Sequence, residues 1–425
     1  MTTLSDPPRA SFRISQLIYD TRYRSLTIQV VAAILLALGL GWLISNTVQN
    51  LEALGKDFDF GFLGNPAGYD INQRLIEYSS QSTHGRAALV GILNTLLVAA
   101  LGCALATVLG VLVGVLRLSQ NWLVSRLMSI YVEGFRNVPL LLWILLIFAI
   151  MTEGMPAPRD FRGDQPEASM ALNESVAATN RGVYIPRITF TRSLSGNEAV
   201  PSREGAPATS AGLIDWALVL GVLLASLFAI SRIRKWTAQQ QEQTGERPVT
   251  WYYQLGLLII PVAIVMVILG ATILKPYLKG FNFDGGIHLR NSLIALWLAL
   301  SLYTSAFIAE LVRASILAIS KGQTEASYAL GLRPGRTMSL VILPQALRIL
   351  IPPLISQYLN LTKNSSLAIA VGYMDVRSTL GGITINQTGR ELEGMLLLGL
   401  FYLVISLGIS TVMNVYNNAV KLKER

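Results

Sequence analysis

Charged side chains, histidine and cysteine are scarce in this chain of 425 residues. Asp, Glu, Lys and Arg together make up 14% of it, His occurs 2 times, and there is 1 Cys, Cys103. A single cysteine excludes an intrachain disulfide framework and a cysteine-based zinc site. His84 and His288 stand alone, without HExxH or another ligand spacing, so we expect no metal site.

A phosphate-binding P-loop is missing as well. The motif GxxxxGK[ST] does not occur, and the Gly55-Lys56 pair is followed by Asp57 rather than by Ser or Thr. We therefore expect this chain not to bind ATP itself. A membrane enzyme would have to work with carboxylates and hydroxyls alone, and no motif places them together, so we predict no catalytic residues.

Apolar side chains are abundant, at 52% of the chain, which is too many for an ordinary soluble protein of this length. A membrane-spanning helix needs about 20 apolar residues. The net charge of +9 is spread in short groups between the apolar runs, which favours a charge bias across a bilayer over a nucleic-acid surface. Eight spans are predicted, at about 27–46, 88–116, 138–152, 212–231, 254–274, 291–319, 346–361 and 392–418.

The basic residues predict the orientation of these spans. A cytoplasmic N-terminus places the bases of 9–24, 232–235 and 421–425 on the cytoplasmic side. With eight spans, both termini are then cytoplasmic. The first apolar run has no clear small-residue cleavage site, so it is expected to be a retained helix. The long outer segments 47–87 and 153–211 are rich in Gly, Ser and Asn, and we expect surface loops with little core of their own.

A polar stretch, EASYALGLRPGRTMSLVILP at Glu325 to Pro344, interrupts the apolar segments on the predicted cytoplasmic side. Its first half favours a helix and ends in a glycine suited to a left-handed turn, and its second half begins another helix. A short helix, a turn and a second helix would form a compact knob that stands out of the membrane. The alternative is a plain loop between two spans.

Within this knob, Glu325, Ala326, Ser327, then Gly331, and later Val341-Ile342-Leu343-Pro344 resemble the EAA loop of ABC importer permeases, with Ser327 in place of the usual second Ala. The preceding SLYTSAFIAELVRASILAISKGQ is similar to the polar amino-acid subfamily of these permeases. NTLLVAALGCALATVLGVLVGVLRLS and YVEGFRNVPLLLWILLIF fit the first core helices of the same subfamily. The resemblance covers about 86–152 and 286–420.

The resemblance implies that the knob docks into a cleft of an ATPase subunit. ATP and magnesium would be bound by that subunit, while this chain binds no cofactor. The other partners implied are a second homologous permease chain, in a heterodimer, and a periplasmic amino-acid-binding protein at a bacterial inner membrane. The coupling residues carried over from the motif are Gly322, Gln323, Glu325, Ala326, Ser327, Gly331, Leu332 and Pro344.

The expected fold is an all-α integral membrane protein in which a five-helix permease core carries three extra helices. Such extended permeases resemble those of broad-specificity glutamate, glutamine, aspartate and asparagine importers. The predicted segments are an N-terminal helix and outer loop at 1–85, the first core part at 86–152, an insertion at 153–285, and the second core part at 286–425 with the coupling loop 321–344.

Charged residues inside predicted spans are candidates for the substrate path because charges are costly there. Glu310 and Arg313 are spaced i, i+3 and can pair, either as a structural pair or with a role in gating or substrate contact. Glu133 and Arg136 have the same spacing, just before a helix break that ends at Pro139. Arg136 either holds a substrate carboxylate by a two-point fork or belongs to an interfacial salt bridge.

A second candidate segment is LTKNSSLAIAVGYMDV, at the expected outer end of the pathway. An amino acid carries both an ammonium and a carboxylate, so its site needs an acid together with a base or backbone donors. The alternative is a structural re-entrant loop. The candidate residues of this segment are Lys363, Asn364, Ser365, Ser366 and Asp375.

An autonomous secondary amino-acid transporter or channel is the main rival to the permease interpretation. That class predicts inverted repeats and several carboxylates near the middle of the membrane, and the sequence shows neither clearly.

Overall fold

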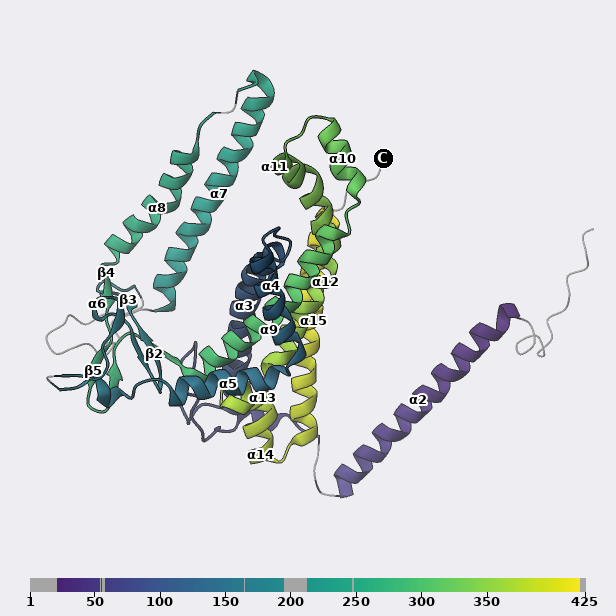
Figure 1. Ribbon diagram of the computed structural model, residues 1–425. Helices are drawn as coiled ribbons and strands as arrows, with labels where there is room; N and C mark the ends of the chain where they lie inside the picture. Colours follow the sequence, from purple (N-terminus) through teal and green to yellow (C-terminus); the bar gives the residue numbers. More distant parts are fainter. Residues whose placement is uncertain are drawn as a thin grey trace, which may run out of the picture. The chain divides into compact units, whose positions relative to one another are not determined.

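The computed structural model describes residues 21–53, 55, 58–163, 165–194, 212–246 and 248–420, and it is mostly helical (Figure 1). Two compact units divide the chain at Leu63. The first unit consists mainly of one helix, α2 (Thr21–Ala53), and none of its side chains from Arg24 to Ala53 is buried. An apolar helix of 33 residues is long enough to cross a bilayer, as predicted for 27–46.

The second unit is built around α9 (Asn291–Leu317), the most deeply buried of the long apolar helices that the structure describes. It packs most extensively against α3 (His84–Leu116), and also against α4 (Trp122–Asn137), α5 (Leu140–Glu153) and α12 (Leu343–Asn364). The core between these helices is apolar and includes Val98, Leu296, Leu300, Ile308 and Leu361.

Helices α3 and α9 approach closely because α3 has glycines on the contact face. A Cβ added at Gly110 would lie 2.6 Å from the Cβ of Ile308, and one added at Gly114 would lie 2.7 Å from the carbonyl oxygen of Ala309. Two glycines spaced i, i+4 are a common device for close helix packing in membranes. Larger side chains at these positions would force the two helices apart.

The predicted helix break near Pro139 is confirmed. Helices α4 and α5 together are apolar enough for one span, but they meet at a bend of 106°. Pro139 sits at the N-cap of α5, where its missing N–H leaves no internal hydrogen bond unmade.

After α9, the chain forms α10 (Lys321–Ala329), α11 (Pro334–Thr337) and a π-helical segment (Met338–Ile342) that leads into α12. The apolar helical stretch there runs from Pro334 to Val371, so the predicted span 346–361 was too short. The charged residues Arg336 and Lys363, which lie outside the predicted range, interrupt the hydropathy pattern near its two ends. The chain then forms a 3-10 helix (Ser365–Val371), α13 (Val376–Ser378), a π-helical segment (Thr379–Thr384), α14 (Ile385–Thr388) and α15 (Glu391–Val420).

The predicted insertion contains a helical hairpin, α7 (Leu213–Thr244) and α8 (Trp251–Ile268), between two strand-forming segments. The strands pair antiparallel in the orders β1-β2-β7, β3-β4 and β5-β6, and the β2-β7 and β3-β4 pairs join the segment before the hairpin to the segment after it. The predicted span 254–274 therefore ends too late. Its last residues form β4, and the strand bounds are β1 Ala177–Thr179, β2 Gly182–Ile185, β3 Arg187–Phe190, β4 Ala271–Leu274, β5 Tyr277–Lys279, β6 Asn282–Asp284 and β7 Ile287–Arg290.

The outer segments, expected to be surface loops with little core of their own, form small clusters in their described parts together with residues from elsewhere in the chain. Tyr184 is 2% exposed and stacks on His288, with the ring centroids 4.2 Å apart. Phe283 packs in the same cluster. Between α2 and α3, Ile71 and Tyr78 are buried in a second small cluster. Short one-turn helices complete these segments, at Gly61–Gly64, Pro158–Phe161 and Ala171–Glu174.

In the described part of the chain, 7 helices are long and apolar enough to cross a membrane, or 8 if the bent α4–α5 pair counts as one span. This agrees with the predicted helical membrane protein of about eight spans. The four segment boundaries proposed from the sequence stay a prediction.

Candidate coupling surface and translocation path

Helix α10 is the first half of the predicted knob, and a glycine turn ends it. Gly331 has a φ of +76°, a left-handed conformation that favours glycine. The N–H of Leu332 donates to the Ser327 carbonyl at 3.0 Å and the N–H of Gly331 donates to the Tyr328 carbonyl at 2.9 Å. These two bonds form a Schellman motif, which satisfies the last carbonyls of the helix and fixes the direction of the chain toward α11.

Most residues predicted to contact an ATPase lie on the surface of the knob, but Ser327 does not. Ser327 is 4% exposed, and its hydroxyl donates to the Gln323 carbonyl at 2.6 Å. A small residue is needed here because α10 packs against the segment Met338–Ile342. Leu332 is half-buried, and the exposed members of the predicted set are Gly322, Gln323, Glu325, Ala326, Gly331 and Pro344.

Glu310, near the end of α9 that leads to α10, lies among three arginines, and these four residues are called the Glu310 cluster below. Arg117, at the end of α3, donates to Oε2 of Glu310. Arg313 Nη1 lies 3.3 Å from Oε1, and Arg136 Nη1 lies 3.8 Å from Oε2. The predicted Glu310–Arg313 pair therefore exists, within a larger cluster that ties together α3, α4 and α9.

Arg136 pairs with Glu310 rather than with Glu133. Its guanidinium also lies over the ring of Phe307, 5.2 Å from the centroid. Glu133 is on the exposed face of α4, and among the described residues no ion pair joins it to Arg136. Of the two alternatives stated for Arg136, a salt bridge is present, and its partner is Glu310 on α9.

Asp375 is fully buried at the outer end of the predicted pathway. Its Oδ1 caps α13, accepting hydrogen bonds from the Ser378 N–H at 2.8 Å and the Ser378 hydroxyl at 2.9 Å. Its Oδ2 has no hydrogen-bond partner among the described residues. Burial raises the pKa of Asp375 from 3.8 to about 6, against the smaller opposing effects of the Ser378 hydrogen bonds and the Arg377 charge.

Polar side chains of α3 hold the segment around Asp375. Asn94 Nδ2 donates to the carbonyls of Gln73 at 2.7 Å and Met374 at 2.9 Å, while its Oδ1 has no partner among the described residues. Thr95 Oγ1 accepts from the Val376 N–H at 3.1 Å. Oδ2 of Asp375 and Oδ1 of Asn94 are thus two buried oxygens in one region that can still accept hydrogen bonds.

The other residues predicted along this segment are placed differently. Lys363 is exposed at the end of α12, and no ion pair in the described part of the chain joins it to Asp375. Ser365 is buried, and its hydroxyl donates to the Thr362 carbonyl at 2.7 Å, a local structural bond. Asn364 and Ser366 are half-buried. The structure does not bring the predicted acid and base together.

Sequence reasoning missed Arg117, Asn94 and Thr95. Arg117 follows the long apolar run of α3 and reads as a residue at the membrane surface, so nothing local shows that it reaches Glu310. Asn94 and Thr95 did carry a signal, because polar residues inside an apolar helix are often functional or bonded to another helix.

The comparisons with known proteins show the family of this chain. Residues 236–422 match the family described as binding-protein-dependent transport system inner membrane component. The chain is 57% identical over 433 residues to the glutamate/glutamine/aspartate/asparagine transport system permease protein BztB of Rhodobacter capsulatus, covering 100% of both chains. The chain belongs to this permease family. It is a transport component with several spans in the membrane.

Two further relatives of the permease are similar over nearly their whole length. It is 40% identical over 417 residues to the general L-amino acid transport system permease protein AapQ of Rhizobium johnstonii, covering 98% of this chain and 96% of the relative. It is 41% identical over 404 residues to the putative amino-acid ABC transporter permease protein YhdX of Escherichia coli, covering 95% of both chains. The similarity therefore includes the insertion and the α7–α8 hairpin.

Proposed function

We propose that the permease moves polar L-amino acids, namely glutamate, glutamine, aspartate and asparagine, across a bacterial inner membrane. Movement would be driven by ATP hydrolysis in separate ATPase subunits, which bind ATP and magnesium. A second homologous permease chain completes the pathway, and a periplasmic binding protein delivers the substrate. The full-length similarity to permeases named for these amino acids supports the substrate class.

The observation that carries the coupling role is the exposed helix α10. It is short, fixed by the Gly331 turn, and joined by residues 318–320 to α9, the central helix of the core. A rigid knob at the end of a central helix gives another protein's motion a surface on which to act. In the proposed topology, α10 and both chain termini lie on the cytoplasmic side, where the ATPase binds.

Cysteine crosslinking tests this proposal, because two neighbouring residues of α10 differ in exposure. In a Cys103→Ala background, Ala326→Cys is exposed, whereas Ser327→Cys is buried and serves as its matched control. We expect Ala326→Cys to crosslink to a cysteine in the docking cleft of the ATPase subunit, with a yield that changes on ATP addition. Ser327→Cys should crosslink weakly under the same conditions.

No crosslink from any exposed position between Gly322 and Leu332, with the ATPase subunit present in the membranes, would contradict the coupling role. An autonomous secondary transporter would then be the better explanation. Uptake assays in proteoliposomes with and without ATP separate these two classes of transporter.

A further inference from the structure

The hairpin of α7 and α8 stands apart from the other helices of the second unit in its packing. The main contact of α7 is with α8, and much of its apolar surface is exposed, including Leu220, Leu224 and Phe228. In a membrane, such a surface faces lipid acyl chains. The hairpin is therefore a part of the permease that meets lipid along most of its length.

The last turns of α7 reach one surface of the membrane. The helix starts next to the β3-β4 sheet, where Asp215 bonds the Leu194 N–H at 2.8 Å. From Leu213 to Ser231, an α-helix rises about 28 Å, close to the thickness of the hydrocarbon core. Arg232 and the residues after it consequently lie at the opposite interface. Helix α9 also crosses the membrane once, starting after β7 and ending before α10. The interface that the last turns of α7 reach is therefore the one on the side of α10.

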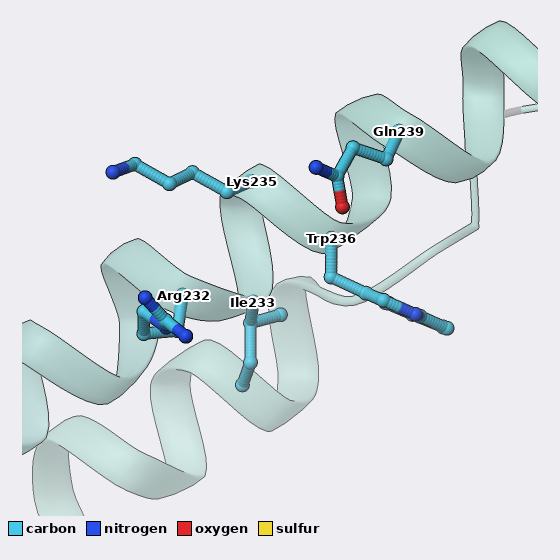
Figure 2. A pocket seen from close by; sticks show the side chains of 5 residues that line it. All are labelled: Arg232, Ile233, Lys235, Trp236 and Gln239. Atoms are coloured by element: carbon cyan, nitrogen blue, oxygen red, sulfur yellow. The ribbon is translucent and has the colours of Figure 1, made fainter.

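A cleft of about 480 Å³ lies at this end of α7, lined by Arg232, Ile233, Lys235, Trp236 and Gln239 (Figure 2). Four of these residues, at positions 232, 235, 236 and 239, share one face of the helix because they are spaced by three or four residues. We call this surface the α7 cleft. It combines two cations, an amide and an indole at the depth of the lipid headgroups.

The two cations of the α7 cleft are available to an anion from outside the chain. Arg232 and Lys235 are both exposed, and no Asp or Glu among the described residues forms an ion pair with them. Arg234 differs, since its Nε donates to Gln254 of α8 at 3.0 Å and so belongs to the hairpin's own packing. The next acid along α7, Glu242, is seven residues beyond Lys235, about 10 Å along the helix.

Aromatic residues mark the same level on both helices of the hairpin. Trp236 is 50% exposed on α7, and Trp251 and Tyr252 are 67% and 48% exposed at the start of α8. Tryptophan and tyrosine gather at membrane interfaces, where one part of the ring system is in contact with acyl chains and the polar group with water. A bound headgroup at the α7 cleft would therefore have its acyl chains beside the exposed apolar surface of the hairpin.

We propose that the α7 cleft binds the headgroup of an anionic phospholipid from the leaflet on the α10 side. Arg232 and Lys235 would hold the phosphate, Gln239 would bond headgroup hydroxyls, and Trp236 and Ile233 would pack against the first carbons of the chains. Basic clefts beside membrane helices suit anionic headgroups because the charge attraction adds to the burial of acyl chains. The assignment of that leaflet as cytoplasmic rests on the proposed topology, whereas lipid binding does not depend on transport.

Retention of phosphatidylglycerol by the purified transporter tests this proposal. The complex is reconstituted in nanodiscs of phosphatidylglycerol and phosphatidylcholine, released into mild detergent, and the bound lipid is counted by native mass spectrometry. At about 1 kcal/mol per basic residue, the pair Arg232→Gln and Lys235→Gln should weaken phosphatidylglycerol retention about 30-fold. Phosphatidylcholine retention should not change.

Control variants separate site binding from a general charge effect. The pair Arg126→Gln and Lys275→Gln removes the same charge elsewhere in the permease and should leave retention unchanged. The exchanged pair Arg232→Lys and Lys235→Arg keeps both cations and should retain phosphatidylglycerol, even if the glutamine pair proves difficult to fold. Soluble glycerol phosphate should not displace the lipid, because it lacks the chains that lie along the hairpin.

Three results would overturn the proposal. The first is equal phosphatidylglycerol retention by the native protein and the glutamine pair. The second is equal loss in the control pair, which would show a non-specific charge effect. The third is loss of ATPase subunits or of the second permease chain from the glutamine pair with lipid retention intact, which would make the α7 cleft a protein contact.

Discussion

Replacing Glu310 with Gln should destabilise the permease, because it removes the only carboxylate of the Glu310 cluster and leaves three arginines together. The side chains of Arg117, Arg136 and Arg313 are 11%, 40% and 38% exposed, and that of Glu310 is 31% exposed. Removing one partner of a buried ion pair costs about 3–5 kcal/mol, whereas an exposed pair contributes about 0.2–1 kcal/mol. Since Arg117 alone is nearly buried, we expect a loss of about 2–4 kcal/mol.

The measurement is thermal unfolding of the purified permease in detergent, with binding-protein-stimulated ATP hydrolysis of the assembled complex as a second readout. A loss of this size should lower the melting temperature by about 5 °C. Stimulated hydrolysis should fall as well, because the Glu310 cluster fixes the end of α9 from which α10 extends. Glu133→Gln is the matched control, since it removes a carboxylate from the exposed face of α4 that forms no ion pair with another described residue.

A double-mutant cycle tests the physical reason. If Arg117 is the main partner, Arg117→Gln combined with Glu310→Gln should be less damaging than the sum of the two single changes. Equal melting temperatures for Glu310→Gln and Glu133→Gln would refute the assigned role of the cluster. Additive effects in the cycle would show that Arg117 and Glu310 act independently.

Three other substitutions test the turn, the buried carboxyl and the helix packing. Gly331→Val places a branched residue at a φ of +76°, which costs about 1–2 kcal/mol, and the substitution should abolish stimulated ATP hydrolysis. Gly335→Ala, whose added Cβ would have no neighbour within 4 Å, should leave stimulated ATP hydrolysis intact. Asp375→Asn should stabilise the protein by up to about 3 kcal/mol at pH 7.5. Because burial raises the folded pKa of Asp375 to about 6, the destabilisation by its charge is present above that pH and absent below the unfolded pKa of 3.8. The advantage in melting temperature should therefore shrink as the pH falls from 6 toward 4, and a pH-independent advantage would contradict the explanation. Gly110→Val should cost about 1–3 kcal/mol in thermal stability through overpacking against α9, and Gly134→Val, with no neighbour within 4 Å, should cost less.

The membrane helices were predictable because their physical signal is local. A run of about 20 apolar residues identifies a span without knowledge of its neighbours. The break at Pro139 and the turn at Gly331 were also predictable, since each depends on the backbone of one residue. Where charged residues occur near the ends of a helical stretch, as Arg336 and Lys363 do, the same signal made the predicted helix too short.

The strand pairs were not predictable for the opposite reason. Strands of 3 or 4 residues are too short for a clear period-two pattern. In addition, β3 and its partner β4 are separated in the sequence by the whole α7–α8 hairpin. The expected loops therefore gained a small core, with Tyr184 stacked on His288, that neither segment has alone.

The candidate site shows the same division between local and distant contacts. The spacing of Glu310 and Arg313 predicted their pair correctly, whereas the equal spacing of Glu133 and Arg136 is not accompanied by an ion pair among the described residues. Helical spacing states which side chains can meet but not whether a better partner lies on another helix. Arg136 instead joins Glu310, to which Arg117 comes from 193 positions earlier in the chain.

These contacts make α9 a physical connection between the two membrane surfaces. At its start, Asn291 Nδ2 donates to the Asn180 carbonyl at 2.7 Å and so joins α9 to the turn between β1 and β2. At its other end, the Glu310 cluster fixes α9 to α3 and α4 just before the chain enters α10. A displacement of α10 would therefore move a helix held at both ends, in a core too closely packed at Gly110 to deform continuously. Under the proposed coupling role, such an element would move as a rigid body between discrete positions, as alternating access requires.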